Sequence, residues 1–198
     1  MSRSISRRGM VQSLSAGLGV SSMLRVITIG AAEHAHLVIR AERSQTPAGS
    51  YTPKFFNSHE YRTLQFLCQA IVPPDERSGG AIEAGAPEFI DLLTSENKQY
   101  QLTLGGGLLW LDATCRVRYG KVFLECRPVE QNQILELIAF RAHAIKDPSL
   151  SQGVKFFAFL RNLTLDGFYT SEIGIKDLQY IGNTHLADFP GCPPVPEL

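Results

Sequence analysis

The longest run of hydrophobic positions that keeps a helical period lies in residues 154–182. When residues 154–166 are placed at 100° per residue, the polar side chains of Lys155, Asn162 and Asp166 share one narrow stripe. Phenylalanine and leucine fill most of the remaining surface of that helix. A helix with so little polar surface is buried by its neighbours or by a partner chain, so we expect the rest of the chain to pack around it.

One charge interrupts this apolar surface. Arg161 falls on the side that carries Phe157 and Phe168, where an unpaired buried charge would cost several kcal/mol. Either its long side chain reaches solvent at the edge of the helix, or a carboxylate or backbone carbonyls bind the guanidinium. Glu172 and Asp166 are candidate carboxylates within this chain, and the large partner inferred below is the other source.

The same period predicts further helices over residues 58–72, 87–93, 99–119 and 128–143. Gly167 is expected to end the long helix, and a second helix is expected to begin near Glu172. The glycine run at residues 105–107 either breaks the third helix or admits another backbone closely. No strand pattern is longer than residues 121–124. We therefore predict an all-α domain, a single irregular helical unit with a loop-rich, proline-rich tail after residue 181.

Three parts of the chain differ in composition. Residues 1–43 carry six arginines and two acidic residues, a net charge of +4. Because the whole chain has a net charge of zero, residues 44–198 carry a net charge of −4. Residues 44–57 contain Pro47, Gly49 and Pro53 among polar residues, as linkers do. We assign residues 1–43 to a signal segment, 44–57 to a linker and 58–198 to the helical domain. The helical domain has no cluster of lysine and arginine, which argues against nucleic acid as a partner.

The N-terminal segment has the features of a twin-arginine export signal. Ser6, Arg7, Arg8 and Met10 precede a weakly apolar run at residues 13–32, with Met10 where phenylalanine is usual. Two adjacent guanidiniums offer permanently charged donor forks that lysines would not reproduce. The alternatives are a disordered basic tail or a single membrane anchor, and Arg25 would be costly in a bilayer. We expect export to the periplasm by the twin-arginine translocase.

The cleavage site of this signal is poorly marked. Ala31, Ala32 and Ala35 are small enough to precede a cut, but Glu33 and the neighbouring histidines interrupt the pattern. The pair His34 and His36 has metal-like spacing, although we interpret it as part of a solvated tail. Because the twin-arginine route carries folded proteins, a cofactor or a folded partner is expected to accompany the chain.

The predicted helical domain carries no clustered set of residues typical of a cofactor site. The glycine-rich loop at residues 78–81 lacks the strand and the lysine of a phosphate-binding loop. His59, His143 and His185 are dispersed, and the cysteines form no CxxC pair. After export, at least one of Cys115, Cys126 and Cys192 is expected to be oxidised. We therefore expect no catalytic, metal or cofactor residue in this chain, and clustered ligands would instead favour a stand-alone periplasmic binding or redox protein with a Cys/His metal site.

Three segments resemble one known family. Residues 67–76 read LCQAIVPPDE, residues 79–91 read GGAIEAGAPEFID, and residues 168–174 read FYTSEIG, followed by YIGN at 180–183. In this order they are similar to the gluconate 2-dehydrogenase subunit 3 family, the small subunit of membrane-associated gluconate 2-dehydrogenase. The resemblance covers about residues 58–192 together with the N-terminal signal.

The resemblance implies a non-catalytic accessory subunit. In such complexes a large FAD-containing subunit of the glucose-methanol-choline type oxidises a sugar, glucoside, sugar acid or polyol, and a cytochrome c or a quinone accepts the electrons. The small subunit carries the export signal, helps the large one to fold and brings it into the periplasm, where the complex is associated with the membrane. FAD is therefore expected in the partner, and we place the partner interface at Arg161, Phe168, Tyr169 and Cys192.

Overall fold

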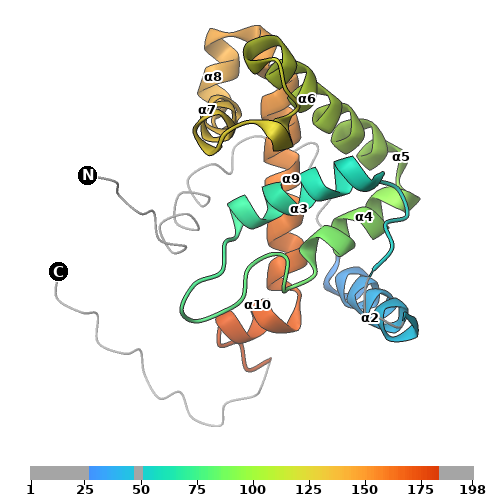
Figure 1. Ribbon diagram of the computed structural model, residues 1–198. Coiled ribbons are helices and arrows are strands. Elements are labelled where there is room, and N and C mark those ends of the chain that lie inside the picture. Colours follow the sequence, from blue (N-terminus) through green and yellow to red (C-terminus); the bar gives the residue numbers. More distant parts are fainter. Residues whose placement is uncertain (1–26, 47–50, 183–198) are drawn as a thin grey trace, which may run out of the picture.

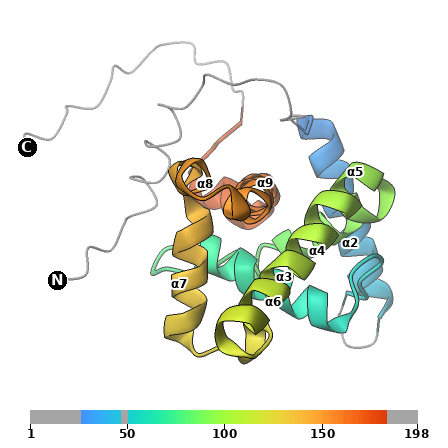
Figure 2. The ribbon, with the colours of Figure 1, turned by 90° about the horizontal axis from the view of Figure 1, so that it is seen from above.

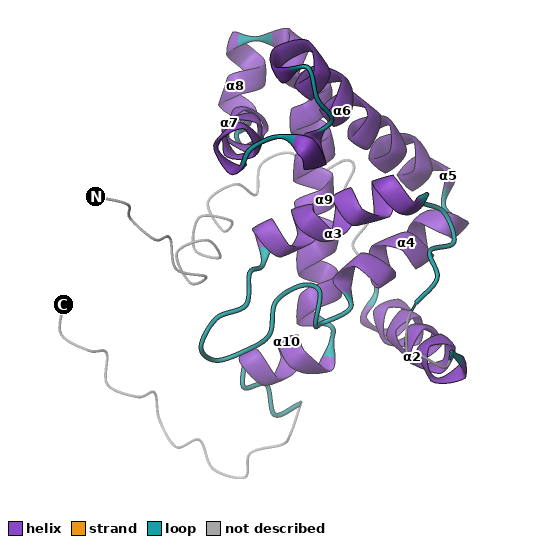
Figure 3. Ribbon diagram, viewed as in Figure 1, coloured by secondary structure: helices purple, strands orange, loops and turns teal. Residues whose placement is uncertain are grey.

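The computed structural model describes residues 27–46 and 51–182. Within these residues the chain forms helices, turns and loops and contains no strand (Figure 3), which confirms the all-α prediction. Ser6, Arg7, Arg8 and Met10 of the predicted signal, and Cys192 of the predicted interface, lie outside the described residues.

The helices follow one another along the chain as α2 (Ile29–Gln45), α3 (Ser58–Ile71), α4 (Ala86–Glu96), α5 (Lys98–Tyr100), α6 (Gly106–Tyr119), α7 (Pro128–Ala139), α8 (Arg141–Lys146), α9 (Ser151–Tyr169) and α10 (Glu172–Asp177). A π-helical turn, η2 (Gln101–Gly105), joins α5 to α6 without interrupting the helix, and two 3₁₀ turns are η3 (Phe123–Glu125) and η4 (Pro148–Leu150). The helix expected over residues 128–143 is two helices, because Phe140 takes an extended conformation between them.

Helix α9 is the centre of the fold. It contacts α3, α4, α6, α7, α8 and α10, and it runs through the middle of the molecule in both views (Figures 1 and 2). Its side chains Phe156, Leu160 and Phe168 are buried, with at most 1% of their surface exposed. The hydrophobic pattern of residues 154–166 predicted this role correctly.

Gly167 does not end α9, which continues to Tyr169. Instead the glycine lets α4 approach closely, because a Cβ at position 167 would lie 3.2 Å from the Cα of Ala86 and 3.0 Å from the ring of Phe89. The expected helix end at Gly167 was therefore wrong. The glycine is explained by packing between helices rather than by helix termination.

Asp91 of α4 organises the chain that leads into α3. Its buried carboxylate accepts hydrogen bonds from the backbone amides of Lys54 (2.6 Å), Phe55 (3.1 Å) and Phe56 (3.1 Å) and from the hydroxyl of Tyr51 (2.9 Å). Four donors on one carboxylate tie residues 51–56 to the body, so this half of the predicted linker packs on the domain.

Helix α2 also packs on the body, although residues 29–43 were expected to belong to the signal segment. Its side chains Ala32, Ala35 and Ile39 are buried, with at most 4% of their surface exposed, and the helix contacts α4. His36, expected in a solvated tail, stacks on the ring of Phe89 with centroids 5.2 Å apart. In the structure, residues 29–45 are thus part of the folded domain.

Candidate partner interface

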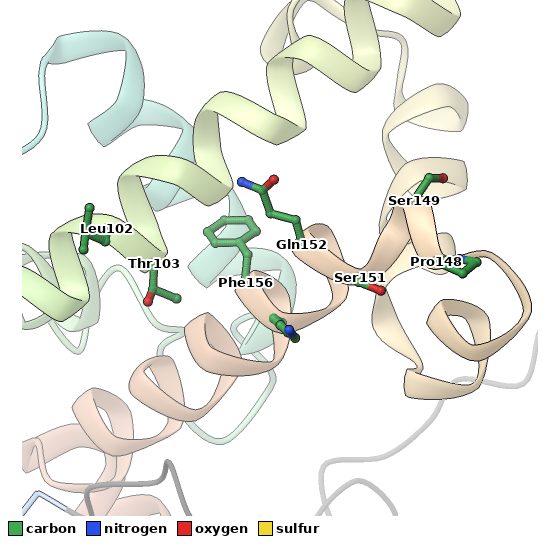
Figure 4. A pocket seen from close by; sticks show the side chains of 8 residues that line it. Leu102, Thr103, Pro148, Ser149, Ser151, Gln152 and Phe156 are labelled. Carbon is green, nitrogen blue, oxygen red and sulfur yellow. The ribbon is translucent and has the colours of Figure 1, made fainter.

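Two of the hollows on the surface of the described residues bear on a possible site. The first is an open groove of about 500 Å³ between η2 and the start of α9 (Figure 4), lined by Leu102, Thr103, Pro148, Ser149, Ser151, Gln152, Lys155 and Phe156. Gln152 closes one side by donating to the carbonyl of Gly106 at 3.1 Å. Lys155 is the only ionisable side chain among these lining residues, so the groove brings together no acid–base pair.

The second hollow, of about 170 Å³, contains a histidine–carboxylate pair. Nε2 of His59 lies 2.7 Å from Oδ2 of Asp112, whose Oδ1 accepts the backbone amide of Phe123 at 2.9 Å. The carboxylate therefore joins α3 and the η3 turn to α6. No partner for His59 could be predicted from the sequence, because Asp112 lies 53 positions away and only the helix packing brings the two together.

The described cysteines are free and buried. Burial raises the pKa of Cys68 to about 12. Burial and the neighbouring thiol of Cys126 raise the pKa of Cys115 to about 12. These groups are protonated thiols near neutral pH, not nucleophilic thiolates. A disulfide in the exported protein stays a prediction.

No group of three or more histidine, cysteine or acidic side chains that could hold a metal ion occurs among the described residues. Among those same residues, no helix is both long enough and apolar enough to span a bilayer.

Residues 71–85, which connect the motif segments 67–76 and 79–91, form a compact loop. The amide of Ala81 donates to the carbonyl of Val72 at 2.9 Å, and the amide of Gly80 donates to Glu83 at 2.9 Å. Gly85 then starts α4 with φ of +77°, in the left-handed region that favours glycine. These residues therefore determine the backbone conformation of the loop.

The motif at residues 168–174 turns the chain from α9 into α10. The hydroxyl of Ser171 donates to the carbonyl of Phe168 at 2.6 Å and accepts the amide of Gly174 at 3.1 Å, which caps α10. A Cβ on Gly174 would lie 2.0 Å from the carbonyl oxygen of Phe168, so a side chain there would open the turn.

The structure places the predicted interface residues unequally. Phe168 has no exposed surface, so the structure places it in the core and not on the predicted interface. Tyr169 is half-buried and packs edge-on against Phe168, with ring centroids 5.1 Å apart. Arg161 is also half-buried and reaches the surface.

Arg161 has no carboxylate partner among the described residues. Its Nε is buried without a hydrogen bond, and burial followed by the charge of Arg141 lowers its pKa. Of the two internal candidates, Glu172 pairs with Arg40 at 2.7 Å, and Asp166 forms no ion pair with it. The side chain therefore combines partial desolvation with a second positive charge nearby, an arrangement that favours an anionic group from outside.

Exposed apolar side chains flank Arg141 along the chain, and its helix α8 packs on α9, the helix of Arg161. Phe140, between α7 and α8, is 62% exposed, and Ile145 of α8 is 83% exposed. We refer to Phe140, Arg141, Ile145 and Arg161 as the Arg161 surface. Large exposed apolar side chains and an arginine without a carboxylate partner are typical of protein–protein interfaces, in which aromatic residues and arginine are enriched.

A helical domain with such a surface has the features of a subunit that binds another protein. The chain belongs to the family described as gluconate 2-dehydrogenase subunit 3, whose model matches residues 58–191, and the resemblance of the three motifs is thereby confirmed. It is accordingly a subunit of a gluconate 2-dehydrogenase-like complex. No curated protein matched the chain, and no solved structure matched it.

Proposed function

We propose that this chain is the accessory subunit of a periplasmic FAD-dependent dehydrogenase of the glucose-methanol-choline type, which acts on a sugar, glucoside or polyol. Family membership supports the association with a dehydrogenase, and the sequence Ser6-Arg7-Arg8-Gly9-Met10 supports the export role. The catalytic subunit holds FAD and passes electrons to a cytochrome c or a quinone. The accessory chain supports its folding and carries it through the twin-arginine translocase.

The observation that carries the binding role is the unsatisfied guanidinium of Arg161. A carboxylate on the catalytic subunit would accept two parallel hydrogen bonds from the guanidinium and balance the added charge of Arg141. Phe140 and Ile145 would exclude water around that pair, which strengthens the electrostatic attraction. The Arg161 surface is therefore proposed to contact the catalytic subunit.

Export is tested by co-expressing both subunits with Arg7 and Arg8 replaced by lysine. Both chains then stay in the cytoplasm, and sugar-dependent dye reduction in the periplasm falls to background. The variant Arg3→Lys makes the same change in the same segment outside the arginine pair and leaves export intact. Full periplasmic activity with Arg7→Lys and Arg8→Lys together would refute export of the complex by this signal.

Association is tested separately by tagging this chain and purifying it from cells that make both subunits. The purified material shows a flavin absorption spectrum and reduces dye in the presence of sugar. The same chain made alone lacks the flavin bands. A preparation without flavin from co-expressing cells would contradict the proposed partner.

A further inference from the structure

Helix α2 overlaps the stretch in which the signal was expected to be cut. The helix begins at Ile29, and the side chain of Thr28 caps it by accepting the amide of Ala31 at 3.3 Å. The candidate cleavage alanines Ala31, Ala32 and Ala35 all lie in its first two turns. A cut after any of them would remove the first residues of the helix itself.

One face of α2 is buried against the body. Ala32 and Ala35 are 1% and 4% exposed, whereas Leu37 on the opposite face is 62% exposed. Nε2 of His36 lies 2.9 Å from the hydroxyl of Thr170, at the α9–α10 corner. The helix is therefore docked through small side chains and a half-buried histidine, although most of it falls within the predicted signal segment.

Two ion pairs extend this docking to the last turns of α2. Arg40 binds Glu172 of α10 at 2.7 Å, and Arg43 binds Glu88 of α4. Glu88 is only 7% exposed, so its carboxylate depends on Arg43 for a compensating charge. Loss of α2 would leave a buried, unpaired carboxylate, which is strongly destabilising.

We infer that α2 belongs to the mature subunit, and that any removal of the signal occurs at a peptide bond before Ile29. The inference rests on the proposed export. Because twin-arginine substrates cross the membrane folded, a signal peptidase would meet α2 already docked. Hydrolysis adds water across one peptide bond, which must be extended in the active site of the protease. Residues 31–35 are instead helical, and Ala32 and Ala35 face the body.

The first test is the N-terminus of the small subunit in the complex purified from the periplasm, read by intact mass and N-terminal sequencing. The expected chain retains residues 29–198, with an N-terminus at Ile29 or earlier. An N-terminus at Ala32, Glu33 or His36, which follow the three candidate alanines, would overturn the inference.

A second test does not require export. Limited trypsin digestion of the full-length chain, retained in the cytoplasm with its partner by Arg7→Lys and Arg8→Lys, is expected to trim no further than Arg25. Cleavage after Arg40 or Arg43 at the rate of the earlier sites would show that α2 is not docked. If export fails but the digestion gives the expected pattern, the proposed function is refuted and the inference about α2 is not.

Matched substitutions in the full-length chain measure the docking itself. Ala35→Glu forces a charge under α2 and is expected to lower Tm by at least about 5 °C and to expose Arg40 and Arg43 to trypsin. Leu37→Glu, on the exposed face of the same helix, leaves Tm and the digestion pattern unchanged. Equal behaviour of the two variants would refute the inference.

Discussion

Trp110 of α6 lies against Gly153 of α9, and a Cβ built on that glycine would be 2.3 Å from the ring atom Cζ3. One turn away the glycine is on α6 and the ring is on α9, and a Cβ on Gly107 would lie 2.0 Å from the ring of Phe156. Each helix thus places an aromatic ring over a glycine of the other. These two contacts determine how closely α6 and α9 cross.

Gly107→Ala is therefore expected to destabilise the domain by about 1–3 kcal/mol, since overpacking forces side chains or backbone to shift. The clash includes Cβ of Phe156 at 2.6 Å, an atom close to the backbone that cannot rotate away. Thermal or denaturant unfolding of the subunit measures the effect.

The neighbouring glycine is the matched control. A Cβ on Gly106 would meet only the side-chain nitrogen of Gln152 at 3.7 Å, and the residue has helical φ and ψ. Gly106→Ala should therefore leave stability unchanged or raise it by up to about 1 kcal/mol through the helix propensity of alanine. Equal losses for both substitutions would contradict the packing explanation.

Asp91→Asn is expected to destabilise the domain by about 2 kcal/mol or more. The asparagine side chain retains one acceptor oxygen. Its NH₂ group replaces the other carboxylate oxygen, which accepted two hydrogen bonds, so two donors lose their acceptor. Glu96→Gln makes the same chemical change at an exposed position of α4 and should be neutral. Denaturant unfolding compares the two, and a neutral Asp91→Asn would show that the 51–56 segment does not depend on this carboxylate.

Alkaline pH should weaken the fold. Burial raises the pKa of Cys68 from its ordinary value of 9.0 to about 12, and burial together with the charge of Glu88 raises the pKa of Tyr61 above its ordinary value of 10.0. Above pH 9.0 the unfolded chain loses protons that the folded chain retains. The folded state then binds more protons, so the free energy of unfolding falls as pH rises.

Tyr61→Phe isolates one part of this pH dependence. The hydroxyl of Tyr61 is buried without a hydrogen bond, so its removal should cost little stability at neutral pH. The variant should lose less stability than the parent above pH 10.0, the ordinary pKa of tyrosine. Unfolding curves measured from pH 7 to 11 test this, and parallel curves over the whole range would exclude Tyr61 as a contributor.

The helical period was sufficient to predict the central element of the fold. Because residues 154–166 are apolar on nearly all sides, they could be buried only by packing against neighbouring helices. Helix α9 contacts several such helices. The place of α2 could not be predicted in the same way. Its buried alanines also fit a weakly apolar signal, and its partners Glu88 and Glu172 are 45 and 132 positions from Arg43 and Arg40.

The candidate interface was predicted only in part. Arg161 stood out because a single charge interrupts an apolar helix face, and the structure shows it half-buried and without a carboxylate among the described residues. Phe168 was expected at the interface, but it is completely buried near the end of α9, just before the turn built by Ser171 and Gly174. The start of a second helix near Glu172 was predicted, but the helical period carries no signal for the burial of Phe168.

Arg161→Ala should separate binding from folding. Without a carboxylate partner among the described residues, and with Arg141 nearby, the guanidinium contributes little to the stability of the isolated subunit. The free energy of unfolding of the subunit alone should therefore stay the same or rise. The yield of complex with the catalytic subunit should fall at least about tenfold, equivalent to about 1.4 kcal/mol, because a carboxylate of that subunit would lose its partner.

Two further substitutions identify what the catalytic subunit recognises. Arg161→Lys should recover little of the complex, since one ammonium cannot replace the two parallel donors of a guanidinium. Lys155→Ala removes an equal charge from an exposed position of the same helix and should leave the yield unchanged. If Arg161→Ala assembles and is exported as well as the parent, the guanidinium only extends along the helix to solvent, and the Arg161 surface is not the binding site.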